Sequence, residues 1–148
     1  MEVNNKILFL CTMFLIIIFY GCSEEVSPSE QIDILSNKWS LSKITDIDGN
    51  LILVPQENLE YSIQFVNNDS TIVQSACNVG FGKYLVFEDK SLSISIGCTE
   101  AACLTPPPYL GYCDNLSNST HYEIKENVLK IFFIDFYGNE KILIHNKN

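Results

Sequence analysis

Four cysteines in the second half of the chain are the residues best suited to chemistry. Cys77, Cys98, Cys103 and Cys113 follow one another at spacings of 21, 5 and 10 positions. A structural zinc site usually takes its thiolates as two close pairs, and this spacing does not provide them. An even number of cysteines in an exported chain is typical of disulfides. We therefore expect two disulfides and no metal, with three pairings open from the spacing alone.

The two histidines, His121 and His145, belong to no recognisable catalytic motif. His121 stands at the start of a predicted strand, and His145 lies close to the end of the sequence. Neither accompanies a nucleophile in a pattern that would support general-base catalysis. We expect ordinary surface or strand histidines, no cofactor, and a protein that is not an enzyme.

The segment DIDGNLILVPQE invites a test for calcium binding. Its oxygen-bearing residues fall at positions 1, 3, 5 and 12 of a calcium-loop pattern: Asp46, Asp48, Asn50 and Glu57. The sixth position requires glycine for its sharp turn, but Leu51 stands there, and the flanks alternate like strands rather than helices. Asp48-Gly49 is better interpreted as a hairpin turn.

The N-terminus has the features of an export signal. Residues 7–20 carry no charge and form an apolar run shorter than the roughly 20 residues of a membrane-spanning helix. The next residues, Gly21 and Cys22, resemble the end of a bacterial lipoprotein signal, in which the cysteine receives lipid. An ordinary secretory signal beside a coincidental cysteine is the alternative. We expect residues 1–21 to be a signal peptide and Cys22 to anchor the protein in a membrane through its acyl chains.

Residues 22–35 are acidic and polar, and we expect them to form a flexible tether. Their start, Ser23-Glu24-Glu25, resembles the acidic signal that directs lipoproteins of the Bacteroidetes to the cell surface. A solvated linker that happens to be acidic explains the same residues equally well. The expected location is therefore the outer membrane, on either the periplasmic or the surface side.

Charge excludes two classes of partner. The net charge is −9, and all nine cationic side chains are lysines. Nucleic-acid binding requires a basic face, so we expect none. Docking onto an anionic lipid surface through charge is excluded for the same reason.

Strand-like alternation dominates the sequence after the tether. Removing residues 1–21 from the 148 leaves 127, which is enough for one modest core. We expect a single domain over 36–148, mainly β, with about eight short antiparallel strands in a compact barrel-like or sandwich arrangement. The predicted strands are 38–45, 61–66, 71–77, 83–88, 91–96, 120–125, 128–134 and 138–145.

The alternation fails between Gly97 and Ser119, where one short helix is expected near Tyr109–Leu116. This segment contains TPPPYLGYC, in which three prolines favour a polyproline-like conformation beside two tyrosines. The segment is a candidate interaction loop, and its alternative role is to cover one open end of a barrel. The residues concerned are Pro106, Pro107, Pro108, Tyr109 and Tyr112.

The order of several short motifs resembles the META domain, a family of small β-rich domains common in bacterial lipoproteins. The most specific pieces are CN…GKY, from Cys77 to Tyr84, and TEAAC, from Thr99 to Cys103. The resemblance implies a compact β-structure with a packed helix, no general enzymatic activity, and an association with envelope stress. Ala101 replaces the family's methionine, and LTPPPYLGYCDN replaces its acidic helix.

The same resemblance implies a disulfide pairing, because Cys77 and Cys103 are the cysteines that match the family's motifs. Cys77 with Cys103 then leaves Cys98 with Cys113, which bracket the departing loop. The second choice is Cys77 with Cys98 and Cys103 with Cys113. We expect a non-enzymatic envelope protein that contacts another envelope component; the alternative is a lipoprotein that binds a small ligand in a barrel mouth.

Overall fold

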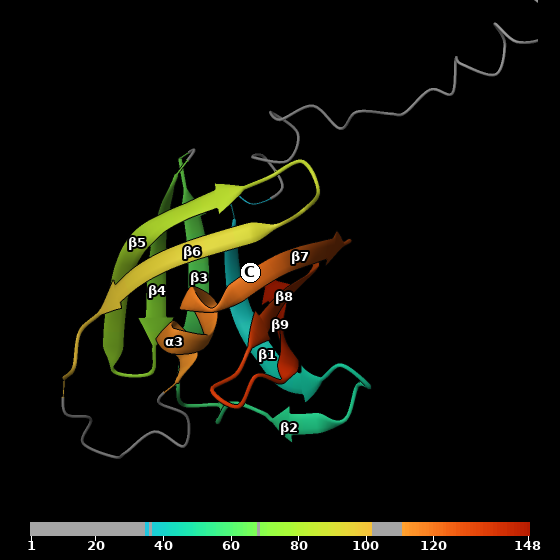
Figure 1. Ribbon diagram of the computed structural model, residues 1–148. Coiled ribbons are helices and arrows are strands. Elements are labelled where there is room, and N and C mark those ends of the chain that lie inside the picture. The colour runs from blue at the N-terminus through green and yellow to red at the C-terminus, as the bar shows by residue number, and fades with distance from the viewer. Residues whose placement is uncertain (1–34, 36, 68, 102–110) are drawn as a thin grey trace, which may run out of the picture.

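The computed structural model in Figure 1 describes residue 35 and residues 37–67, 69–101 and 111–148. Nine strands and the short helix α3 follow one another along these residues. Their bounds are β1 Lys38–Asp46, β2 Leu51–Leu53, β3 Tyr61–Val66, β4 Ser70–Ser75, β5 Asn78–Val86, β6 Leu92–Cys98, α3 Tyr112–Ser117, β7 Ser119–Lys125, β8 Val128–Ile134 and β9 Glu140–Lys147.

The strands form one antiparallel sheet that curls into a nearly closed barrel. Eight of them lie in the order β6-β5-β4-β3-β1-β9-β8-β7, and β2 pairs with β1 beside this path. The end strands β6 and β7 meet at one end of the seam, where Ser91 forms an isolated bridge with His121. There the amide of Tyr122 also donates to the carbonyl of Lys90 at 3.2 Å. The predicted class, mainly β and barrel-like with one short helix, is confirmed.

Side chains fill the interior of the barrel. Along β3, Tyr61, Ile63 and Phe65 point inward and are at most 2% exposed, which is the period-two pattern expected of a half-buried strand. Each large apolar side chain buried in this way stabilises the fold by about 1.5–3 kcal/mol. Leu35, predicted as the last residue of the tether, is also buried in this core. Within the described part of the chain, no helix is long and apolar enough to cross a membrane.

The strand that follows Cys77 begins earlier than predicted. β4 ends at Ser75 because Ala76 adopts a left-handed backbone with φ of 54° and turns the chain. β5 then starts at Asn78 rather than at 83. Two glycines concealed this extension, since glycine weakens an isolated strand. Gly82 is required here because a Cβ atom would overlap the carbonyl oxygen of Ser95 on β6.

The strand β2 was not predicted, although the turn before it was. Gly49 has a φ of +87°, which suits the hairpin turn expected at Asp48-Gly49. The carboxylate of Asp46 accepts hydrogen bonds from both the backbone and side-chain nitrogens of Asn50, at 2.7 and 2.8 Å. Asp46 therefore closes a turn, and β2 pairs back onto β1 with Ile44 opposite Leu53.

Candidate functional site: the helix-covered end of the barrel

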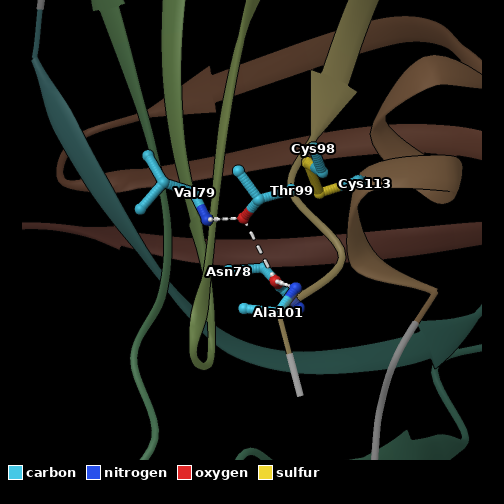
Figure 2. Close-up of a disulfide and its surroundings, with 6 residues drawn as sticks. All are labelled: Asn78, Val79, Cys98, Thr99, Ala101 and Cys113. Atoms are coloured by element: carbon cyan, nitrogen blue, oxygen red, sulfur yellow. Dashed lines mark hydrogen bonds between the residues drawn. A yellow bond between two sulfur atoms is a disulfide. The ribbon is translucent and has the colours of Figure 1, made fainter. Parts of the chain in front are cut away.

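Segments far apart in the sequence meet at one end of the barrel, around Asn78 (Figure 2). The Asn78 side-chain oxygen accepts hydrogen bonds from the amide of Ala101 at 2.7 Å and from the hydroxyl of Thr99 at 3.1 Å. The same hydroxyl accepts a hydrogen bond from the amide of Val79 at 3.2 Å, and the amide of Thr99 donates to the carbonyl of Val79. The start of β5 thus holds the residues that leave β6.

A disulfide between Cys98 and Cys113 ties α3 to the end of β6, with their Cα atoms 6.5 Å apart. This is one of the two bridges in the pairing that the family resemblance implied. It excludes the second choice, in which Cys98 was bonded to Cys77. Cys77 is also disulfide-bonded, and Cys103, its predicted partner, lies outside the described residues.

A surface cavity of about 460 Å³ opens beside this disulfide. Its polar lining comes from Ser75 at the end of β4, from Asn78 and Thr99, and from the exposed carboxylates of Glu100 and Asp114. The two carboxylates come from segments on either side of the disulfide. With these groups the cavity could accept a small polar or cationic group.

In the interior of the barrel, Tyr112 and His145 form a buried polar pair. The hydroxyl of Tyr112, on α3, is hydrogen-bonded to Nε2 of His145, on β9, over 2.8 Å. Neither residue is exposed to solvent. Burial lowers the pKa of His145 to about 3, although hydrogen bonding to the backbone of Leu129 and Leu143 acts in the opposite direction. The imidazole is therefore neutral at physiological pH.

The other histidine occupies a different environment. The ring of His121 stacks on Phe132, with centroids 4.0 Å apart and planes at 13°. Its Nδ1 lies 3.0 Å from the hydroxyl of Thr120. Stacking and this hydrogen bond account for the orientation of the ring on β7. Over the described residues, no group of three or more metal-ligating side chains forms.

The structure places only part of the predicted site. Tyr112, proposed with the prolines as an interaction loop, lies inside the barrel on α3, so it helps to cover the barrel end instead. The described ranges do not include the other residues proposed for lipid attachment or interaction, namely Cys22, Pro106, Pro107, Pro108 and Tyr109. The buried Tyr112–His145 pair was not predicted. Strand period offered a clue to it, since His145 follows the core residue Leu143 by two positions.

Comparison with solved structures returns the same architecture. The barrel is similar to that of a DUF4847 family protein from Bacteroides vulgatus ATCC 8482. The TM-score is 0.54 at 14% sequence identity, over 77% of this chain and 94% of the other. Similarity at this level of identity concerns the fold alone. No family model matches the sequence, and no curated protein matches it.

Proposed function

We propose that this chain is a non-enzymatic, lipid-anchored cell-envelope protein whose META-like domain has an envelope-stress or interaction role. The filled interior of the barrel is the observation that carries this proposal. Trp39, Phe65 and Phe133 are at most 2% exposed and occupy the space that a ligand would need inside. A barrel packed in this way favours a role for its outer surface over enclosure of a small molecule.

Contacts between the two motif pieces support the META-like assignment. CN…GKY and TEAAC are far apart in sequence, yet Asn78 of the first holds Thr99 and Ala101 of the second. Tyr84 packs edge-on against Phe65 and donates a hydrogen bond to the carbonyl of Asn67 at 2.9 Å. The motif residues therefore have structural roles, and these roles account for them without catalysis.

The environments of the histidines support a non-enzymatic role. A general base must reach its substrate and hold a pKa near the working pH. His145 is inaccessible, and its pKa is near 3. One face of the His121 ring stacks on Phe132, and its Nδ1 lies 3.0 Å from the Thr120 hydroxyl.

The lipid anchor is tested on the full chain expressed in a Gram-negative host with a lipoprotein pathway. We expect the mature protein to begin at Cys22, to carry acyl chains by mass spectrometry, and to partition into detergent. Cys22→Ala should remain unprocessed, whereas the control Cys11→Ala should be processed normally. An unmodified Cys22 on an otherwise mature chain would contradict the anchor.

A second experiment tests whether the domain lies on the periplasmic side or on the surface side of the outer membrane. If Ser23-Glu24-Glu25 directs surface export, protease added to whole cells should degrade the domain. Replacing Glu24 and Glu25 with alanine should then protect it. Equal degradation of both forms contradicts the export signal and leaves the anchor untouched.

The cavity beside the Cys98–Cys113 disulfide favours a second candidate function, the binding of a small ligand. Its two carboxylates, on Glu100 and Asp114, suggest a small organic cation. Choline and spermidine are suitable probes in a thermal-shift assay of the full chain. Binding should raise the melting temperature of the wild type and not that of Glu100→Gln/Asp114→Asn. The same shift in both proteins contradicts this site.

A further inference from the structure

The strand β2 leaves one backbone edge open. It pairs with β1 and with no other strand of the described chain. The end strands of the barrel path, β6 and β7, instead face each other, and α3 packs against β6. An open edge presents unpaired amide and carbonyl groups, which favour pairing with another strand. In Figure 1, β2 lies at the margin of the barrel, away from α3.

The side chains of this segment are apolar and exposed. Leu51, Ile52 and Val54 are 62%, 48% and 58% exposed, so apolar groups reach solvent on both faces of the strand. A soluble edge strand is usually protected by charged side chains or by very short length. Here residues 49–56 carry no charge in a chain of net charge −9. Protection comes only from length, because Pro55 ends the segment.

Phe81 is another exposed apolar residue, but it has a partner strand on each side. Phe81 on β5 is 62% exposed but lies directly opposite Ile72 on β4 and Gly97 on β6. No cross-strand neighbour of this kind covers Ile52, since β2 has a partner strand on one side only.

We propose that a second copy of this chain pairs with β2 through its own β2, edge to edge and antiparallel. The partner of an open edge must be an extended strand, and the partner of the apolar faces must carry apolar side chains. The β2 strand of a second copy meets both conditions. The surface of an acidic chain repels its own copies, except where charge is absent. Once the two open edges have paired, neither copy has a free β2 edge left, so the product is a closed dimer rather than a filament.

Charge at the ends of the segment sets the strength of the dimer. Asp48 and Glu57 flank the uncharged residues. Asp48 lies in the turn before β2 and Glu57 in a turn after Pro55, so pairing of the two β2 edges brings like charges of both copies near each other. This repulsion makes the dimer weak at low ionic strength, and salt strengthens it by screening. The proposal does not depend on the lipid anchor.

Sedimentation velocity of the full chain in detergent, over a series of protein concentrations, tests the pairing. We expect a monomer–dimer equilibrium for the wild type that shifts toward dimer as salt increases. Ile52→Lys should weaken association by about tenfold or more, because it places a charge in the apolar centre. The matched control is Ile72→Lys, a 40% exposed isoleucine on β4, which should dimerise like the wild type.

A charge variant makes the test specific. Asp48→Lys replaces an anion next to the paired edges with a cation in each copy, so its dimer should be tighter than that of the wild type at low salt and should gain less from added salt. Val54→Lys replaces Ile52→Lys if circular dichroism shows that the latter is unfolded. A wild type that stays monomeric at every concentration overturns the proposal and leaves a strand of a different protein as the occupant. A dimer that survives both lysine substitutions on the β2 segment also overturns it.

Discussion

The hydrogen bond between Tyr112 and His145 joins α3 to β9 inside an apolar barrel. The phenol ring also packs edge-on against Tyr61, with centroids 5.6 Å apart. A buried polar group is tolerated when it is paired, and it becomes costly when its partner is removed. This pair therefore fixes where the helix sits on the barrel end as well as filling space there.

Tyr112→Phe should destabilise the domain by about 1–3 kcal/mol, since it leaves Nε2 of His145 buried without its partner. Denaturant unfolding with the disulfides intact measures the change. Tyr137→Phe is the matched control, because Tyr137 is 83% exposed and its substitution should change little. Equal stability of Tyr112→Phe and wild type would contradict the role of the bond.

The buried imidazole predicts a loss of stability in mild acid. Above its ordinary pKa of 6.5, His145 is neutral in the folded and unfolded states and has no effect on pH dependence. From there down to about pH 3, only the unfolded state takes up a proton, so stability falls by about 1.4 kcal/mol per pH unit. Unfolding measured between pH 7 and 5 should show this slope, and His145→Gln should flatten it.

Carboxylates contribute in a lower pH window, which keeps the two effects separate. The hydrogen bond from Lys141 and the amides of Asn139 and Tyr137 lower the pKa of Asp135 to about 2. Stability from this group is present above its ordinary pKa of 3.8 and is lost as the pH falls toward 2. A His145 resonance that titrates near pH 6.5 in the folded protein would contradict the acid prediction.

At the scale of elements, the close approach of β5 and β6 depends on glycine. Gly82→Ala should cost about 1–3 kcal/mol, because the new Cβ overlaps the backbone of Ser95 and must push β6 away. Gly97→Ala is a sharp control on the neighbouring strand, where a Cβ meets nothing within 4 Å. That variant should stay within about 0.5 kcal/mol of wild type by denaturant unfolding. Similar effects of the two variants would contradict the packing argument.

Alternation was sufficient to predict eight of the strands and the class of the fold. It located β3 as residues 61–66, the same bounds that the structure has, because every second side chain there enters the core. It missed β2, because the apolar residues of this strand are mostly exposed and do not alternate with polar ones. It shortened β5, because Gly80 and Gly82 are acceptable in a strand only through contacts with β6 that the sequence does not show.

The candidate site was predictable in its parts but not in its geometry. The pieces CN…GKY and TEAAC could be picked out in the sequence by their resemblance to the META domain. The same resemblance implied the bridge between Cys98 and Cys113. That Asn78 would hold Thr99 and Ala101 depends on the register of β5 with β6, which pairs Gly80 with Cys98. The cavity and the burial of His145 depend on the position of α3 against the barrel. A helix of six residues is too short for its hydrophobic pattern to predict that position.

For the whole molecule, the Cys98–Cys113 disulfide should contribute to global stability. The bridge spans 15 residues of sequence, and closing a loop of that length in the unfolded chain is worth about 3 kcal/mol. Cys98→Ala/Cys113→Ala should therefore lower the melting temperature by roughly 10 °C. The double substitution leaves Cys77 and its bond in place. Calorimetry measures the change, and an unchanged melting temperature would contradict it.

The position of β1 between β3 and β9 has a consequence for the timing of folding. β1 pairs with β3 only through Lys38–Ser40, whereas its ladder with β9 runs from Trp39 opposite Lys147 to Asp46 opposite Lys141. Most of the hydrogen bonds of β1 therefore cannot form until β9 has been synthesised, about a hundred residues later. During synthesis the emerging chain lacks this partner and cannot complete the barrel. Such a chain stays loose while it is being made, which is the condition required for threading through a narrow protein-conducting pore.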